Sequence, residues 1–176
     1  MGKYGASAVF NGTNAYVASG FTAPTSTTAS ISVWVKIAAY TNYGGFVGDS
    51  TGASATARFF LGQGGGTSGN LWVSVGNGSS SWYDETTVSL ASYGLNTWFN
   101  LVGTVDGTAV KIYINGSLIQ SFTSTVSYTG NGQDNYYFGG WGSSLFLNGE
   151  MDQIRFFGDA LTLSQVQDLY NNETEC

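Results

Sequence analysis

Apolar and polar residues alternate with a period of two over much of the chain, the pattern of β-strands that bury one face. The clearest example is the segment 101–122. It contains three apolar runs separated by two turn pairs: 101–105, Asp106-Gly107, 110–114, Asn115-Gly116 and 118–122. Asp-Gly and Asn-Gly favour the tight turns that join antiparallel strands. The segment therefore predicts a three-stranded antiparallel meander.

Other segments with strand-like composition are bounded by clusters of Gly, Ser, Asn or Asp. They are 30–37, 58–61, 71–75, 87–90, 136–139 and 146–157. Strands this numerous and this regularly spaced predict two packed antiparallel sheets. Trp34, Trp72 and Trp98 lie inside strand patterns, so we expect them in the core. No linker or low-complexity stretch divides the chain, which predicts a single domain over residues 1–176.

The hydrophobic period changes near the end of the chain, over residues 161–170. Thr162 and Gln165 have the spacing of a capping box, while Leu161 and Val166 have that of a hydrophobic staple. One short C-terminal helix is therefore expected. The predicted fold class is all-β, a two-sheet antiparallel sandwich with this single helix.

The composition points to a surface made of small polar residues. Of 176 residues only 9% are charged, against about a quarter in ordinary soluble proteins, and 26 are glycine. This balance is typical of extracellular and virion β-proteins. The formal net charge of -6, with only five Lys and Arg, leaves no patch that could neutralise several phosphates. Nucleic-acid and anionic-membrane partners are therefore disfavoured.

The sequence shows no predicted signal peptide, membrane-spanning helix or disulfide. The start lacks the apolar core of a signal peptide, and its Met favours a particle protein assembled in the cytosol. Apolar runs are far shorter than the roughly 18 residues that a membrane-spanning helix needs. Cys176 is the only cysteine, so no intramolecular disulfide is expected.

Four segments, in order, resemble the laminin-G-like, concanavalin-A-like jelly-roll family. They are 8–17 with Phe10-Asn11-Gly12, 31–36 with its central Trp34, 97–116 with Trp98 and two turn pairs, and 147–162 with Gly149-Glu150-Met151-Asp152. The resemblance spans nearly the whole chain and implies a jelly-roll sandwich. Members of this family include sugar binders, adhesion modules, hydrolase appendages and virion parts, so the resemblance does not define a ligand.

Enzymatic activity is disfavoured by the residues present. The chain has no histidine, which excludes Ser-His-Asp and Cys-His catalysis and His-ligated zinc. Glu150 and Asp152 are two apart on an expected strand, at about the 6.5–7 Å spacing of a carboxylate pair in glycosidases. The segment is similar to the catalytic strand of jelly-roll β-glucanases, but Gln153, Ile154 and Arg155 stand where the further Glu belongs.

The resemblance also implies a structural calcium ion. In the family, the Asp at the position of Asp152 joins oxygen atoms near the first strand, here at Asn11 and Gly12. Hard oxygen ligands suit Ca²⁺. The alternative is that Asp152 simply accepts a hydrogen bond from a neighbouring backbone N–H.

Ligand-facing residues are expected in loops. Sugar recognition uses flat aromatic faces together with amide or carboxylate partners. The candidates are Tyr43, Trp82, Tyr83, Asp84, Asp134, Asn135 and Trp141. Turn formation explains the stretch 130–135 equally well, and core packing or a subunit contact could explain Trp82 and Trp141.

The sequence favours a non-catalytic glycan-binding or adhesion module on a virion or cell surface, with multimeric display supplying avidity. The alternative is a structural virion protein, a capsid decoration or tail component, whose aromatic residues contact neighbouring subunits. A glycosidase using Glu150 and Asp152 is the third reading.

Overall fold

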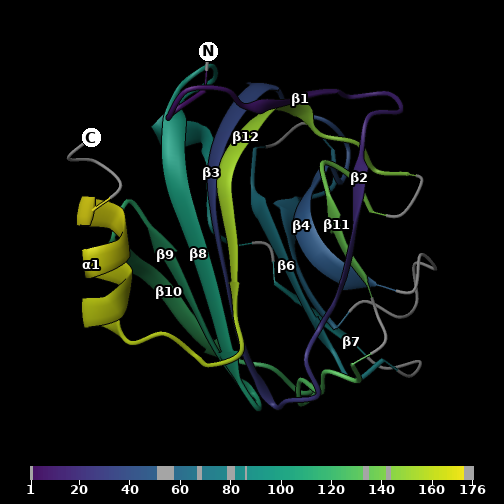
Figure 1. The fold of residues 1–176 in the computed structure, drawn as a ribbon, viewed down its shortest axis with the longest axis vertical. Coiled ribbons are helices and arrows are strands. Elements are labelled where there is room, and N and C mark those ends of the chain that lie inside the picture. Colours follow the sequence, from purple (N-terminus) through teal and green to yellow (C-terminus); the bar gives the residue numbers. More distant parts are fainter. Residues whose placement is uncertain are drawn as a thin grey trace.

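The computed structural model describes residues 2–50, 58–66, 69–78, 82–85, 87–132, 135–141 and 144–172. Two six-stranded antiparallel sheets pack face to face, as the sequence predicts (Figure 1). Sheet A has the order β1 (Ala8–Asn11), β12 (Asn148–Phe157), β3 (Thr28–Ala39), β8 (Trp98–Asp106), β9 (Ala109–Ile114) and β10 (Ser117–Thr123). Sheet B has the order β2 (Val17–Thr22), β11 (Asn135–Phe138), β4 (Gly45–Ser50), β5 (Phe59–Gln63), β6 (Leu71–Gly76) and β7 (Trp82–Glu85). A short 3₁₀ helix, η1, spans Ala91–Tyr93.

The core lies between the sheets and is formed by alternate residues of facing strands. From β3 it takes Ile31, Val33, Val35 and Ile37, each at most 1% exposed. Sheet B contributes Phe46, Val47, Phe59, Leu61, Val73 and Val75 to the same buried cluster. This shared interior binds the two sheets to each other.

The predicted meander is confirmed as β8, β9 and β10. Asn115 and Gly116, with φ of 50° and 75°, connect Ile114 to Ser117. Positive φ at both positions is what a type I′ turn requires, and it explains this residue pair. The turn between β8 and β9 is formed by Gly107 and Thr108, because Asp106 pairs with Ala109. It lies one residue later than the predicted turn pair Asp106-Gly107.

The predicted C-terminal helix is also confirmed, as α1 (Leu163–Asn172). The Thr162 backbone N–H donates to Gln165 Oε1 at 2.9 Å, and the Gln165 N–H donates to Thr162 Oγ1 at 3.3 Å. The helix lies against the outer face of sheet A (Figure 1), where Val166 is buried with Val102 and Tyr113.

Several strand boundaries differ from the prediction. Residues 8–17, the first segment that resembles the family, contain all of β1 and the first residue of β2, and these strands belong to different sheets. Asn11 makes the turn between them, since its Oδ1 accepts hydrogen bonds from the N–H groups of Thr13, Asn14 and Ala15. Residues 87–90 form only an isolated bridge, Ser89 with Asn70.

The three tryptophans assigned to the core lie outside the space between the sheets. Trp34 is buried on the outer face of sheet A, stacked on Tyr170 of α1 at 5.7 Å between ring centroids. Trp72 is buried on the outer face of sheet B. Trp98 is only half-buried, with Lys36 Nζ 5.1 Å from its ring centroid.

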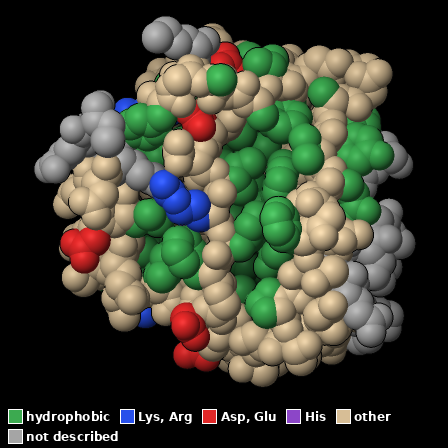
Figure 2. Space-filling model, viewed as in Figure 1, with side chains coloured by type: hydrophobic (Ala, Val, Ile, Leu, Met, Phe, Trp, Pro, Cys, Tyr) green, Lys and Arg blue, Asp and Glu red, His purple; other side chains and the backbone are tan. Residues whose placement is uncertain are grey.

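An apolar groove runs between the later part of β12, beyond its pairing with β1, and the edge strand β2 of sheet B (Figure 2). Its volume is about 320 Å³. It is lined by Phe21, Thr22, Pro24, Tyr136, Phe156, Phe157 and Gly158. Phe21 is 74% exposed at its rim.

Candidate functional site

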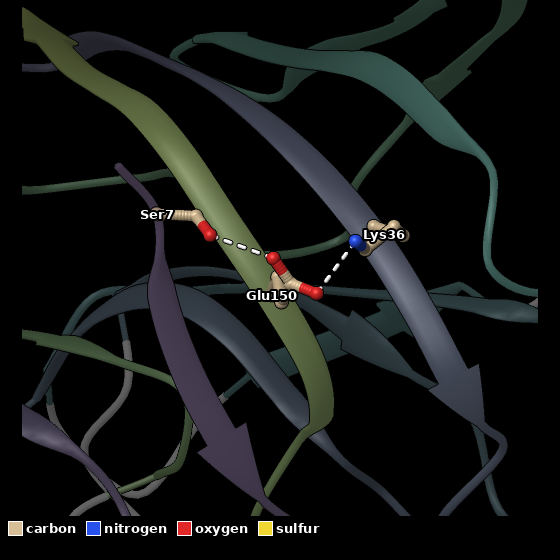
Figure 3. Close-up of polar contacts among 3 residues, drawn as sticks. All are labelled: Ser7, Lys36 and Glu150. Atoms are coloured by element: carbon tan, nitrogen blue, oxygen red, sulfur yellow. Dashed lines mark hydrogen bonds and ion pairs between the residues drawn. The ribbon is translucent and has the colours of Figure 1, made fainter. Parts of the chain in front are cut away.

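Glu150 and Asp152 lie on the same face of β12, as their spacing predicts, because their register partners are Lys36 and Trp34 on the outer face of sheet A. Glu150 forms an ion pair with Lys36 at 2.5 Å and accepts a hydrogen bond from Ser7 Oγ at 2.6 Å (Figure 3). The hydrogen bonds from Lys36 and then Ser7 hold the pKa of the Glu150 carboxyl below its ordinary value of 4.5.

A glycosidase needs one carboxyl that stays protonated near neutral pH so that it can act as the general acid. The partners of Glu150 lower its pKa and so favour the ionised carboxylate, not the protonated acid. Asp152 has both carboxylate oxygens engaged by backbone groups, accepting from the Tyr4 N–H at 2.9 Å and the Gln153 N–H at 2.8 Å. The hydrogen bonds of Glu150 and Asp152 therefore argue against glycoside hydrolysis by this pair of carboxyl groups.

Asn11 and Asp152, both expected to bind calcium, are well separated in the register of β1 and β12. Asn11 pairs with Asn148, four positions before Asp152 on β12, which separates their backbones by about 13 Å at the rise of a β-strand. Among the described residues no group of three or more Asp, Glu, His or Cys gathers around a common point. The backbone hydrogen bonds of Asp152 match the alternative stated above. Calcium binding at Asp152, Asn11 and Gly12 stays a prediction.

The outer face of sheet B carries four aromatic residues joined by ring contacts, here called the outer aromatic cluster: Tyr43, Phe60, Trp72 and Trp141. Trp141 stacks on Phe60 at 4.6 Å and 28°, and lies 5.0 Å from Trp72. Tyr43 meets Trp72 edge to face at 5.1 Å. Phe60, Trp72 and Trp141 are each at most 7% exposed, whereas Tyr43 is 39% exposed.

Strand alternation places Phe60 and Trp72 on this face. Their neighbours Phe59, Leu61 and Val73 point into the core, so Phe60 and Trp72 point out. Glycines beside Phe60 make room for its ring, because a Cβ atom would lie 2.5 Å from it at Gly48 and 2.7 Å from it at Gly62.

Two loops complete the outer aromatic cluster. Trp141 is fixed by backbone hydrogen bonds in both directions with Ser144, at 2.8 and 3.1 Å. Tyr43 has a φ of 57° and its ring lies over Gly65, where a Cβ atom would be 2.6 Å from its hydroxyl oxygen. The neighbouring Asn42 accepts a hydrogen bond from the Gly66 N–H at 2.6 Å. The exposed ring of Tyr43 is thus held in place from both sides.

A second group of rings continues the same face towards β2. Tyr16, 43% exposed, lies 6.3 Å from Tyr137 of β11 and 6.2 Å from Phe146. Tyr137 pairs with Gly48, on the row that also holds Phe60. The face therefore offers exposed tyrosine rings at two places, with buried aromatic residues between them.

The structure joins some of the predicted ligand residues and separates others. Tyr43 and Trp141 come together through Trp72 and Phe60, which the sequence analysis did not select. Strand alternation could have indicated the position of Trp72, because its neighbours Leu71 and Val73 are both apolar and point to the opposite face. Asn135 begins β11, paired with Thr22 and Ser50.

Tyr83 faces the interior, where its ring lies 5.7 Å from Phe122 of sheet A. Trp82 and Asp84 belong to the edge strand β7 and not to a loop, with Gly76 and Ser74 as register partners. Asp134 lies outside the described residues.

Comparison with known proteins defines the class. A sequence model of the laminin-G type, described as the concanavalin A-like lectin/glucanases superfamily, matches residues 11–167. The chain belongs to this superfamily, as the sequence resemblance predicts. No curated protein sequence matches it. Within the described residues, no helix is both long and apolar enough to cross a bilayer.

Several solved structures share the fold. Domain 4 of AbnA, an extracellular GH43 arabinanase from Geobacillus stearothermophilus solved in complex with arabinotriose, is 29% identical with a TM-score of 0.73, covering 96% of this chain and 78% of that one. The binding domain of botulinum neurotoxin DC in complex with SialylT is 20% identical with a TM-score of 0.60, covering 83% of this chain and 35% of that one. A heptameric SAP-like pentraxin from Limulus polyphemus is 16% identical with a TM-score of 0.66, covering 92% and 80%.

Proposed function

We propose that this protein is a non-catalytic carbohydrate-binding module, displayed on a virion or cell surface, and that it binds its ligand at the outer aromatic cluster. The observation that carries the proposal is the partly exposed ring of Tyr43 against Trp72, which in turn contacts Trp141, on the outer face of sheet B. The likeness to an arabinanase domain solved with arabinotriose supports it.

The physical basis is the match between aromatic rings and the C–H faces of sugars. A saccharide stacked on Tyr43 removes apolar area from water while its hydroxyl groups stay hydrated at the rim. Tyr43 is already fixed by Gly65 and Trp72, so little side-chain entropy is lost on binding. One such contact gives weak affinity, and repeated display of the module would supply avidity.

The test begins with a saccharide array, followed by calorimetry on the saccharides that bind. Tyr43→Asn should weaken binding about tenfold, the scale of losing one stacked ring, and lower the melting temperature only by the few degrees expected from losing its edge-to-face contact with Trp72. Asn is the suitable replacement because it tolerates the positive φ of this position. Phe21→Asn is the matched control, since Phe21 is 74% exposed on the separate groove. Binding that Tyr43→Asn leaves intact, or no saccharide bound at all, would refute the proposal.

A second candidate function is a structural subunit contact, favoured by the apolar groove of Figure 2. Phe21 and Val9 are 74% and 71% exposed, and side chains of this kind usually become buried in assemblies. A stable multimer in sedimentation that Phe21→Asn dissociates, without saccharide binding, would favour this function over the first.

A further inference from the structure

Resting on the proposed function, we infer that the outer aromatic cluster takes an uncharged saccharide and discriminates against sialylated, uronic and sulfated glycans. The inference comes from the positions of the basic residues, all five of which lie in the described part of the chain. Lys and Arg hold a bound carboxylate or sulfate most strongly, because their hydrogen bonds to it are charge-assisted.

Four of the five basic residues lie on the outer face of sheet A, on the opposite side of the sandwich: Lys3, Lys36, Lys111 and Arg155. Lys36, Lys111 and Arg155 alternate with inward-facing residues along β3, β9 and β12. The Lys3 Nζ lies 4.4 Å from the ring centroid of Trp34 on the same face. These cations cannot reach a ligand on sheet B.

The fifth basic residue, Arg58, is only 7% exposed. Its Nη1 donates hydrogen bonds to the backbone oxygens of Asn77 at 2.7 Å and Thr129 at 2.6 Å. Gly78 passes so close to the guanidinium that a side chain at that position would have no room. Arg58 is therefore committed to joining two loops and is closed to solvent ligands.

The strands of sheet B themselves contain three carboxylates, Asp49, Asp84 and Glu85, and no Lys or Arg. Asp49 is fully buried. A carboxylate or sulfate on a bound sugar would lose hydration against the aromatic rings, find no Lys or Arg on these strands, and be repelled by the net charge of -6 on the whole chain. A neutral sugar meets none of these costs.

The experiment compares matched pairs of ligands by affinity electrophoresis and calorimetry. The pairs are lactose with sialyllactose, galactan with polygalacturonan, and unsubstituted xylan with glucuronoxylan. In any pair whose neutral member binds, we expect the acidic member to bind about fivefold more weakly at low ionic strength. This is the scale of one unfavourable charge contact in water. This difference should shrink as salt is added.

A charge-gain variant tests the cause. Ala18 is exposed on β2, and its register row continues through Tyr137 and Gly48 to Phe60. Ala18→Lys therefore places a cation on the same outer face as the proposed site, three strands from Phe60. It should raise the affinity for the acidic member several-fold and leave the neutral member unchanged. Ser121→Lys is the matched control, because it adds the same charge beside Lys111 on the far sheet and should have no effect.

The outcomes distinguish failure of the charge discrimination from failure of saccharide binding itself. Tighter binding of the acidic member in the unmodified protein, lost in Tyr43→Asn, would overturn this inference and leave the proposed function standing. An equal response of Ala18→Lys and Ser121→Lys would also overturn it, since the effect would then come from net charge alone. If no saccharide on the array binds, the proposed function fails and this inference fails with it.

Discussion

Glu150 is held ionised by its two partners, Lys36 and Ser7, and this has a consequence for stability. Its pKa is lowered in the folded protein from the ordinary value of 4.5. A lowered carboxyl pKa contributes stability that is fully present above the unfolded value and is lost as the pH falls through the folded one. Because both side chains of the ion pair remain 20% exposed, we expect a contribution of only about 0.5–1 kcal/mol.

Glu150→Gln should therefore be less stable than the unmodified protein at pH 6–7, with the difference in unfolding free energy vanishing at pH values below the folded pKa. Urea denaturation at several pH values measures it. The double-mutant cycle with Lys36→Met separates the ion pair from the Ser7 hydrogen bond. A difference that stays constant between pH 3 and pH 7 would show that ionisation of Glu150 plays no part.

The sequence placed Trp34 and Trp72 in the core, but both lie on the outer faces of their sheets. Strand alternation indicates that Trp34 and Trp72 oppose their apolar neighbours, but period two does not define which face is inside when both are apolar. β3 is buried on both faces, because α1 covers one of them. Trp72 is buried by Phe60 and Trp141, whose contacts join segments far apart in the sequence. Only the folded structure supplies these neighbours.

At the scale of elements, α1 provides a direct test of local sequence signals. Its capping box is formed by Thr162 and Gln165 as predicted. Removing the capping oxygen in Thr162→Ala should cost about 1 kcal/mol. Thr162→Ser keeps this oxygen and is the control. Thermal unfolding followed by circular dichroism measures both variants, and equal losses in the two would show that the cap contributes nothing.

The elements that sequence reasoning found are those with local rules. Turn pairs such as Asn115-Gly116 fix a hairpin within a few residues. β2 and β4 were missed because their sequences, Val17–Thr22 and Gly45–Ser50, show little alternation. β2 is exposed along nearly its whole length, and β4 contains glycines that make room for Phe60. Their strand conformation is set by their neighbours in sheet B.

At the scale of the whole molecule, the two sheets carry different surfaces on one shared core. Sheet A bears α1 and four of the five basic residues, while sheet B bears the outer aromatic cluster. The pattern of inward residues on both sheets follows from the sequence. The division of charge and aromatic rings between the outer faces does not, because it depends on strand order, which pairs β3 with β12 and β11 with β4.

The shared core predicts that both sheets unfold together, as expected for one domain over residues 1–176. Trp34 reports on sheet A and Trp72 on sheet B, so tryptophan fluorescence and circular dichroism should give coincident guanidinium transitions. Leu61→Ala in sheet B and Ile112→Ala in sheet A remove fully buried side chains and should each cost about 2–5 kcal/mol. Each should move both signals by the same amount. If Leu61→Ala shifts fluorescence and leaves part of the circular dichroism transition in place, the sheets unfold separately and the single-domain prediction is wrong.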